Sequence, residues 1–590
     1  MSVLIVHPDD SPIDDSPIND SPISGPWSRE RWDFILDIGW AGKQTYARWE
    51  QQAGCPVRGF YSYAEGPADF LRIAETLKSA RGFLVDGAGL DWWEILAPLQ
   101  VMEMLQLALA KRVLGELGSA ELVGTRPHPV AALLSRLSGR AIRYWREGDP
   151  GGWSGHLQRL QTAVSVLSPP QLLQAGLDKW DAAYRFRGRF SLPGSARTKG
   201  ALLLPSSYAN VTRVLNAYAQ LIPEQQCLLV TTRMGGNMAG LAPNVLTKSL
   251  AGFAEFRMKE STRKELRGLE RDWTRLQAGP LHDQEDLAWA ARMGWFQSIG
   301  TSLERWLRLR DAWGSVLDRE QIGSVLCGDE NNATNRIPVL LAAQRRLPTV
   351  HCDHGALNVL LPLRSPACDT YLVKGEMERD YMARSAFLGP SFLGPSRMVV
   401  GAPFSFETPA QPERTPDSRR IVFFSEQLEL TFGRTRILYE QLLPRLCELA
   451  RRHGRRVVVK LHPFESLARR SALLTAVLCA QDRVLVDLAH GPLSEDLLRK
   501  TWFALTVESS VSVDCAIRGI PCFLCRWFAT PLTGYDQQLV RHGAAQSLET
   551  PEDVMRIPEM LEGFVVTPEV RRGLWSPLPP GKLRTLLRIS

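Results

Sequence analysis

The 590-residue sequence lacks the short motifs that hold phosphates or a catalytic metal in many nucleotide-binding and hydrolytic enzymes. It has no GxxxxGK[ST] phosphate loop, no GxGxxG turn, no GxSxG nucleophile turn and no HExxH zinc pair. No DxD pair stands in a metal-binding context, because the Asp-rich stretch near the N-terminus is a low-complexity repeat. We therefore predict no metal site and no cofactor.

Cysteine and long apolar runs are also scarce. The ten cysteines are scattered, mostly inside apolar stretches, which predicts buried thiols in a reducing compartment. Cys522 and Cys525 have CxxC spacing, but no second Cys or His pair accompanies them, so a structural role is favoured over a metal or redox role. No apolar run reaches the length of about 18 residues that spans a membrane. The start MSVLIVHPDD lacks the basic region of a secretory signal, so we expect a cytoplasmic protein.

Neither sign of charge is in large excess. The 70 basic and 63 acidic residues leave a net charge of +7. This weak bias is compatible with anionic substrates and with peripheral association at the inner face of an anionic membrane. It does not predict nucleic acid binding, because there is no basic arm and no zinc-finger spacing. The mixed charges within 257–320 predict a solvated helix face.

The sequence does contain a repeated alternation of short strand-like runs, GFLVDG at 82–87 among them, with helix-like segments. Such alternation is typical of βαβ units and parallel sheets, and it restarts after a Pro- and Ser-rich linker. We predict an α/β fold of two facing Rossmann-like domains with helices on both faces of each parallel sheet, plus an N-terminal elaboration. The predicted divisions are an N-terminal α/β region at 1–195 with a disordered Asp-Ser-Pro-Ile repeat at 9–24, an acceptor-side domain at 196–401 with a helical insertion at 245–320, the linker at 402–418, and a nucleotide-donor domain at 419–590.

Ligands of such sheets bind beyond the carboxyl ends of the strands, here in the cleft expected between the two domains. Lys460, His462 and Pro463 follow the run VVVK, where a cation and an imidazole can hold a phosphate or a nucleotide base. The alternative is a loop histidine that simply ends a strand.

A second motif, Glu508-Ser509-Ser510, follows the run WFALTV and opens a helix. Two hydroxyls and unpaired backbone N–H groups at a helix start can bind an anion. One serine can instead be the helix N-cap. The two motifs would meet if their strands are neighbours, and together they indicate a donor site.

Candidate catalytic residues follow two further strands. His354 comes after the run PTV and is a candidate base or oxyanion stabiliser. Asp329 and Glu330 come after SVLC and are candidate bases for a substrate hydroxyl. The alternatives are a structural loop histidine and an acidic cluster that favours a helix dipole.

Weaker candidates stand at similar positions. Ser425 and Gln427 follow the first strand of the predicted donor domain and are assigned to the donor's phosphates. Gly355, Asn331 and Ser207 are assigned to the acceptor side, and Gly355 permits close approach of a ligand to the backbone.

The runs VKLHP at 459–463, ESSVSVDCAIRGIPC at 508–522 and HGA at 354–356 resemble a family. They are similar to GT-B glycosyltransferases of the bacterial surface-polysaccharide group, which includes capsule Kdo transferases, polysialyltransferases and CDP-glycerol glycerophosphotransferases. The resemblance covers roughly 320–530. In the sialyltransferase-like members an HP pair and a Ser-Ser pair bind the cytidine nucleotide, which implies donor roles for His462, Pro463, Ser509 and Ser510.

The same resemblance bears on the base. The related enzymes have an acidic pair before a glycine, whereas here Gly328 precedes Asp329 and Glu330, so the order departs from the family pattern. A His-Gly pair is catalytic in the glycerophosphotransferase-like members, which favours His354.

The expected activity is metal-independent transfer of a sugar or polyol-phosphate unit from a nucleotide-activated donor to a surface-polysaccharide acceptor. The resemblance implies a CMP- or CDP-linked donor as substrate and a glycan or lipid-linked glycan as acceptor. Two alternatives stay open: a nucleotide-sugar 2-epimerase, and a non-catalytic protein that binds nucleotide sugar or glycan within a capsule-assembly complex.

Overall fold

The computed structural model describes most of the chain. The described residues are 1–7, 31–144, 200–232, 240–255, 257–352, 363–384, 397–403, 419–426, 428, 433–462, 465–491 and 493–589. The predicted repeat at 9–24, nearly all of the predicted linker at 402–418 and the part of the N-terminal region at 145–195 lie outside them.

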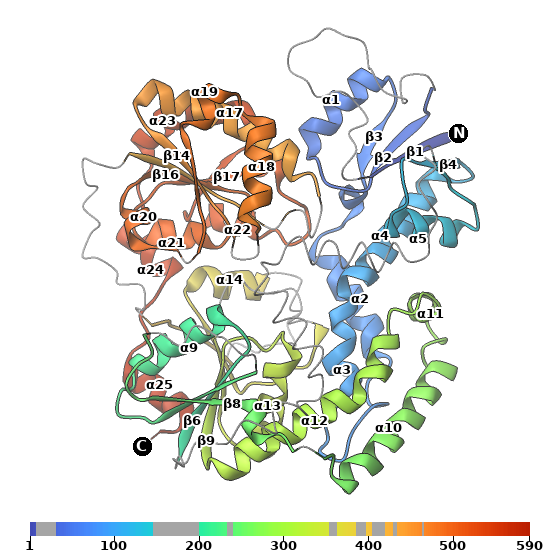
Figure 1. Cartoon of the computed structure of the whole chain (residues 1–590), viewed down its shortest axis with the longest axis vertical. Helices are drawn as coiled ribbons and strands as arrows, with labels where there is room; N and C mark the ends of the chain where they lie inside the picture. Colours follow the sequence, from blue (N-terminus) through green and yellow to red (C-terminus); the bar gives the residue numbers. More distant parts are fainter. Residues whose placement is uncertain are drawn as a thin grey trace. The chain divides into compact units, whose positions relative to one another are not determined.

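Three parallel sheets flanked by helices form the described structure (Figure 1). Short apolar runs form the strands, and amphipathic segments form the helices between them, so the predicted α/β class with parallel sheets is confirmed. The chain divides into two compact units, one of Met1–Gly66, Gln106–Pro170 and Pro409–Val570, the other of Pro67–Leu105, Gln171–Thr408 and Arg571–Ser590.

The first sheet, here the N-terminal sheet, has the strand order β3-β2-β1-β4-β5. Its first strand is central, with later strands added on either side, which is the doubly wound pattern. The strands are β1 (Ser2–Val6), β2 (Phe34–Asp37), β3 (Val57–Gly59), β4 (Glu121–Gly124) and β5 (Arg143–Tyr144). The helices of this part of the chain are α1 (Lys43–Ala53), α2 (Pro67–Lys78), α3 (Trp92–Leu96), α4 (Val101–Leu117) and α5 (Pro129–Ser138).

The middle sheet lies in the second unit and has the order β12-β11-β10-β9-β6-β7-β8. Its strands are β6 (Ala201–Ser206), β7 (Cys227–Thr231), β8 (Val245–Ser249), β9 (Ile322–Cys327), β10 (Thr349–Cys352), β11 (Thr370–Val373) and β12 (Met398–Val400). The helices that follow these strands are α9 (Ala209–Gln220), α10 (Glu260–Ala278), α11 (Glu285–Arg292), α12 (Gln297–Arg319), α13 (Ala333–Gln344) and α14 (Glu376–Arg384).

The last helix of the chain, α25 (Pro580–Leu587), belongs to the middle sheet. Leu583 and Leu587 are buried in one core cluster with Leu202 of β6 and Leu326 of β9. The sequence-based division assigned this segment to 419–590, whereas its apolar face packs on the sheet of the other unit.

The C-terminal sheet has the order β15-β14-β13-β16-β17-β18, again with its first strand in the centre. The strands are β13 (Arg420–Phe424), β14 (Arg456–Lys460), β15 (Val486–Ala489), β16 (Thr501–Thr506), β17 (Cys522–Cys525) and β18 (Gln546–Leu548). The helices are α17 (Thr435–His453), α18 (Leu467–Val477), α19 (Ala480–Arg483), α20 (Glu495–Arg499), α21 (Val511–Ile517), α22 (Tyr535–Arg541), α23 (Ile557–Met560) and α24 (Pro568–Leu574).

One predicted strand is wrong. GFLVDG at 82–87 forms a turn, and the only ladder contact there is an isolated bridge between Val85 and Asp91. The carboxylate of Asp86 accepts the backbone N–H groups of Ala88 and Leu90 at 2.9 and 3.0 Å. Such local side-chain bonds compete with strand pairing, and they close the chain into a turn here.

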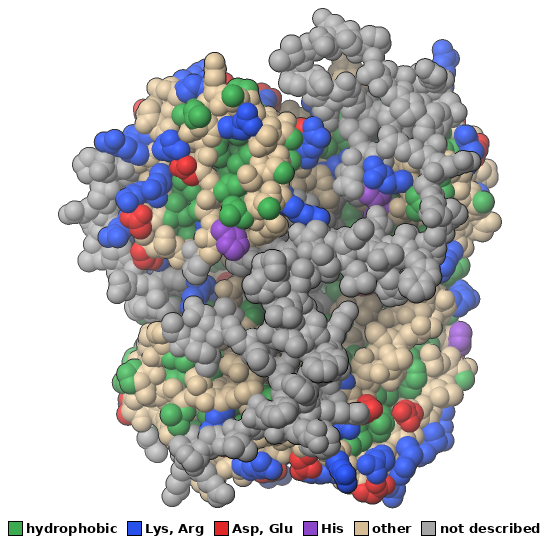
Figure 2. All heavy atoms as spheres, viewed as in Figure 1, with side chains coloured by type: hydrophobic (Ala, Val, Ile, Leu, Met, Phe, Trp, Pro, Cys, Tyr) green, Lys and Arg blue, Asp and Glu red, His purple; other side chains and the backbone are tan. Residues whose placement is uncertain are grey.

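The charged segment 257–320 forms α10, α11 and α12, and the exposed charges of α10 pair along the helix. Figure 2 shows Lys and Arg side chains interspersed with Asp and Glu on the visible face, without a large patch of one sign. Among the described residues, no helix combines the length and the apolar character needed to cross a bilayer.

Candidate functional site

The carboxyl ends of three adjacent strands bring most of the predicted donor residues to one edge of the C-terminal sheet. Lys460 ends β14 and is the register partner of Phe424 in β13, while Leu505 of β16 is the partner of Phe423. The two motif-bearing strands, β14 and β16, are not neighbours, because β13 lies between them. The strand order reverses between β13 and β16, and ligands of doubly wound sheets bind at that switch point.

The hydroxyl of Ser425 connects the end of β13 to the loop after β14. Ser425 Oγ donates to Glu465 Oε1 at 2.8 Å and lies 2.9 Å from the hydroxyl oxygen of Tyr439. Glu465 Oε2 accepts the backbone N–H of His462 at 2.7 Å, and Arg470 forms a buried ion pair with the same carboxylate. The loop that carries His462 is therefore fixed by a connected hydrogen-bond network.

Lys460 and His462 offer a ligand different groups. Lys460 Nζ donates to the carbonyls of Leu461 and Gly491 at 2.8 and 2.7 Å, so within the described part of the chain these bonds use two of its three N–H groups. Burial lowers the pKa of Lys460, and the charge of Glu465 opposes that shift. Burial, followed by the positive charge of Lys460, lowers the pKa of His462, so its imidazole is neutral at neutral pH.

Glu426 connects the end of β13 to the loop after β16. Its Oε1 accepts the hydroxyl of Thr506 at 2.7 Å and the backbone N–H groups of Val507 and Glu508 at 2.8 and 2.9 Å. Burial raises the pKa of Glu426, and these hydrogen bonds oppose the rise. Ser425 and Glu426, the two residues that follow β13, thus form hydrogen bonds with the loops after the neighbouring strands β14 and β16.

Glu508 lies at the switch point itself. Its Oε1 accepts the backbone N–H and the hydroxyl of Thr530 at 2.5 and 3.1 Å. Burial, then the charge of Glu426, and less strongly that of Asp536, raise the pKa of Glu508 to about 8, while the bond from the Thr530 N–H opposes the rise. A carboxyl with this pKa keeps its proton at neutral pH, so it can donate a hydrogen bond to an anion instead of repelling it.

The two serines of the second motif stand at the start of α21. Ser509 Oγ accepts the N–H of Val511 at 3.3 Å, and the Ser509 carbonyl accepts the hydroxyl of Ser512 at 2.9 Å. Ser510 is the N-cap residue by position, but its side chain makes no cap hydrogen bond. The sequence did not decide which serine caps α21. In the structure the capping hydroxyl is that of Ser509, and the Ser510 hydroxyl makes no cap hydrogen bond.

The predicted donor residues that the structure brings to this edge are Ser425, Lys460, His462, Glu508, Ser509 and Ser510. Four other predicted site residues lie outside the described part of the chain: His354, Gly355, Gln427 and Pro463.

In the second unit, the predicted acceptor-side residues gather where the neighbouring strands β6 and β9 end. Asp329 Oδ2 accepts the hydroxyl of Tyr208 at 3.0 Å, and its Oδ1 accepts the backbone N–H of Asn331 at 3.1 Å. Ser207 Oγ accepts the side-chain amide of Asn332 at 3.1 Å. The strand order of the middle sheet reverses between β6 and β9, so these residues also occupy a switch point.

Glu330 differs from its neighbour Asp329 in its surroundings. The side chain accepts the hydroxyl of Tyr371 at 2.8 Å and pairs with Arg336 at 3.4 Å. The residue is 1% exposed, and Arg364 donates to its backbone carbonyl at 3.1 Å. The Glu330 carboxylate is therefore engaged in a buried ionic network.

Sequence reasoning did not select Glu426 or Glu465, although both carry hydrogen bonds that shape the site. Glu426 stands next to Ser425 directly after a strand, and that position was the available signal. Glu465 is three residues beyond His462, and nothing in its local pattern distinguishes it from a surface glutamate. Its burial, at 7% exposed, depends on the fold.

Among the described residues, no group of three or more His, Cys, Asp or Glu side chains is arranged to hold a metal ion. Cys522 and Cys525 are buried free thiols of β17. Burial raises the pKa of the Cys525 thiol, which keeps it protonated and unreactive.

Comparison with protein-family models gives no match, and comparison with curated proteins gives none either. Among solved structures, the S. aureus MnaA–UDP co-structure matches at 12% identity with a TM-score of 0.41, over 66% of this chain and 97% of that one. A putative UDP-N-acetylglucosamine 2-epimerase from Listeria monocytogenes matches at 13% identity with a TM-score of 0.40, over 67% of this chain and 95% of that one. MurG from Acinetobacter baumannii matches at 12% identity with a TM-score of 0.36, over 66% and 100%. Because these identities and TM-scores are low, the matches do not indicate the function of this chain, which we infer from its own residues.

Proposed function

We propose that this chain is a GT-B glycosyltransferase that binds a nucleotide-activated donor at the carboxyl edge of the C-terminal sheet. The observation that supports the proposal is the assembly of Lys460 and His462 after β14 and of Glu508 after β16 at one edge of the sheet, on either side of β13. A cation, a neutral imidazole and a protonated carboxyl are together suited to a phosphate-bearing ligand.

Each group has a separate task in this proposal. The positive charge of Lys460 offsets the charge of the leaving phosphate, and the hydroxyl of Ser510 donates to the same phosphate. His462 hydrogen-bonds the donor through its neutral ring. Because the network through Ser425 and Glu426 fixes both loops before a ligand arrives, little reorganisation is needed when charge develops on the leaving nucleotide.

The proposed base for the acceptor hydroxyl is Asp329. Its Oδ2 is bound by one hydroxyl, that of Tyr208, which a substrate hydroxyl can replace. Glu330 is less suited, because Arg336 and Tyr371 already occupy its carboxylate in the interior. His354 remains a proposed catalytic residue from the sequence.

Calorimetric titration of the full chain with CMP, CDP and UDP tests the donor site. We expect Lys460→Ala and His462→Ala each to weaken binding of the preferred nucleotide about tenfold, the loss of one charge-assisted or neutral hydrogen bond. The matched controls are Lys500→Ala and His453→Ala, which change exposed residues at the opposite edge of the same sheet. Equal affinity of the site variants and the parent would remove the donor-site proposal.

An acceptor-dependence assay separates the transferase from the alternatives. Consumption of a nucleotide sugar only when a glycan acceptor is present supports transfer. Turnover of the donor without acceptor indicates a nucleotide-sugar 2-epimerase. Nucleotide binding with no turnover of either kind, and with no effect of Asp329→Asn, indicates a binding protein.

A further inference from the structure

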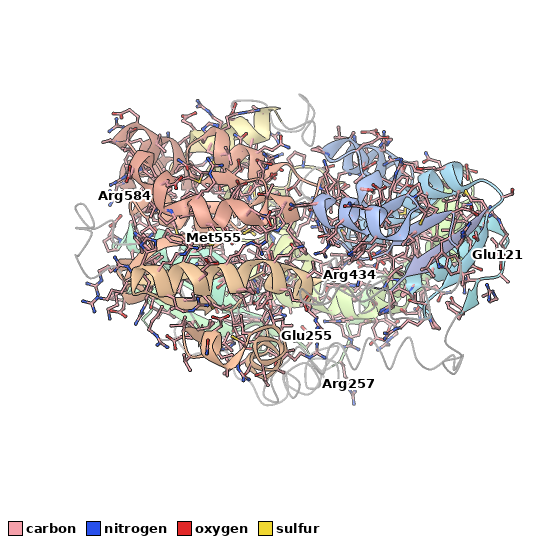
Figure 3. The ribbon with its side chains drawn as sticks, turned by 90° about the horizontal axis from the view of Figure 1, so that it is seen from above. Glu121, Glu255, Arg257, Arg434, Met555 and Arg584 are labelled. Atoms are coloured by element: carbon pink, nitrogen blue, oxygen red, sulfur yellow. The ribbon has the colours of Figure 1, made fainter. Side chains whose placement is uncertain are left out.

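The N-terminal sheet is joined to the C-terminal sheet by a buried ion pair. Asp37, at the end of β2, is fully buried, and its Oδ1 accepts the guanidinium of Arg434 at 2.8 Å. Its Oδ2 accepts the hydroxyl of Tyr46 at 3.0 Å. The Arg434 guanidinium also lies 5.5 Å from the ring centre of Trp49. Figure 3 labels Arg434 at the N-terminal start of α17, beside the N-terminal part of the chain.

The backbone conformation at Arg434 depends on this pair. Arg434 is the residue before α17 and has a positive φ of 63°, which side-chain-bearing residues rarely adopt. The contacts of its side chain with Asp37 compensate for that conformation. Arg434 therefore fixes the start of α17, the helix whose Tyr439 hydroxyl oxygen lies 2.9 Å from Ser425 Oγ.

A second contact fixes the loop after β17. The indole N–H of Trp40 donates to the carbonyl of Phe528 at 2.7 Å, and Trp40 is 1% exposed. Close packing is enforced nearby, since a Cβ on Gly42 would lie 2.3 Å from the carbonyl oxygen of Trp527. Two residues beyond Phe528, Thr530 supplies the two hydrogen bonds that Glu508 accepts.

We propose that Asp37 and Trp40 of the N-terminal sheet are positioning residues for the nucleotide site of the C-terminal sheet. They hold α17 and the loop after β17, which contact Ser425 and Glu508 through Tyr439 and Thr530. This inference rests on the proposed function, because it takes that edge to be the nucleotide site. It gives the N-terminal α/β region, which carries none of the predicted site residues, a role in donor recognition.

The charge state of Glu508 reports on this positioning. The groups that face its carboxyl are Glu426 at the end of β13, Asp536 of α22 and Thr530 in the loop after β17. Burial is the main reason that its pKa is raised to about 8, and Thr530 of that loop binds the carboxyl directly. When the loop loosens, water reaches the carboxyl and its pKa falls, so nucleotide affinity is lost at a lower pH as the ionised carboxylate repels the phosphate.

The experiment measures the dissociation constant of the nucleotide that the parent prefers among CMP, CDP and UDP, from about pH 6 to about pH 9. Trp40→Phe removes one N–H donor and keeps an aromatic ring, and Asp37→Asn removes one charge. We expect each variant to weaken binding about tenfold at neutral pH and to move the midpoint of the affinity loss to lower pH. A stabilising role alone would lower the melting temperature without moving that midpoint.

Matched controls come from the second unit. Trp93 is buried and donates its indole N–H to the carbonyl of Leu77 at 2.8 Å, so Trp93→Phe makes the same chemical change outside the N-terminal and C-terminal sheets. Asp69 is buried and pairs with Arg72 at 2.6 Å, so Asp69→Asn matches Asp37→Asn. Both controls are expected to keep the parent's affinity and pH midpoint.

The outcomes distinguish this inference from the proposed function. A parent protein that binds none of the three nucleotides contradicts the proposed function. A parent that binds, with Trp40→Phe unchanged in affinity and in pH midpoint, overturns the positioning role alone. If Asp37→Asn does not fold, Trp40→Phe decides the question, because it leaves the buried ion pair intact.

Discussion

Replacement of Glu508 by glutamine is expected to stabilise the protein, and to do so increasingly as the pH rises. The glutamine keeps Oε1 as an acceptor for Thr530 but cannot ionise. In the parent, the folded state holds the Glu508 proton up to its pKa of about 8, whereas the unfolded chain releases it near the ordinary glutamate pKa of 4.5. The contribution of Glu508 to the free energy of unfolding is therefore fully present below its pKa in the unfolded chain. It declines as the pH rises toward its pKa in the folded state.

The magnitude follows from proton linkage. Each pH unit between the two pKa values changes the unfolding free energy by about 1.4 kcal/mol. Between about pH 5 and about pH 7.5, the unfolding free energy of the parent should fall by roughly 3 kcal/mol relative to that of Glu508→Gln. This is an upper value, because the carboxyl is not fully buried.

Differential scanning calorimetry of parent and variant at both pH values measures this difference. The control is Glu562→Gln, which changes an exposed glutamate and should leave the gap between the two pH values as in the parent. A melting-temperature difference between parent and Glu508→Gln that is the same at both pH values would refute the raised pKa and, with it, the neutral carboxyl at the switch point.

Three further predictions concern the rest of the molecule. Gly454→Ala should destabilise the protein by about 1 kcal/mol, because φ is 61° at this C-cap of α17. Gly115→Ala, inside α4, should instead stabilise it by up to about 1 kcal/mol. Urea unfolding followed by circular dichroism measures the unfolding free energies of the two variants and the parent. Arg336→Ala leaves Glu330 buried without its cation and should cost about 3–5 kcal/mol, whereas equal melting temperatures of variant and parent would contradict the network. Asp329→Asn should reduce acceptor-dependent turnover by at least about a hundredfold with unchanged nucleotide affinity, and retained turnover would remove it as the base.

Local pattern was sufficient wherever neighbouring residues decide the structure. The helical spacing of Leu438, Leu442, Leu446 and Leu449, followed by Gly454, is enough to indicate α17 and its end, and Gly454 has the left-handed conformation expected of a helix C-cap. Ser494 caps α20 through the N–H of Leu497 at 3.2 Å, which the local pattern SEDLLRK, a serine followed by acidic residues, is sufficient to indicate. The segment 82–87 was predicted as a strand but forms a turn, because the Asp86 carboxylate accepts backbone N–H groups and so competes with strand pairing there.

The sequence by itself determined which residues end strands, because apolar runs followed by polar residues are a local signal, and Lys460, His462 and Glu508 were found in this way. Only the tertiary structure decided that β13 separates their strands and that Ser425 and Glu426 connect the two loops. Strand order depends on how distant segments pack, and proton affinity depends on burial by those same segments. For the same reason, the bond between Asp37 and Arg434, nearly four hundred residues apart, was beyond the reach of sequence pattern.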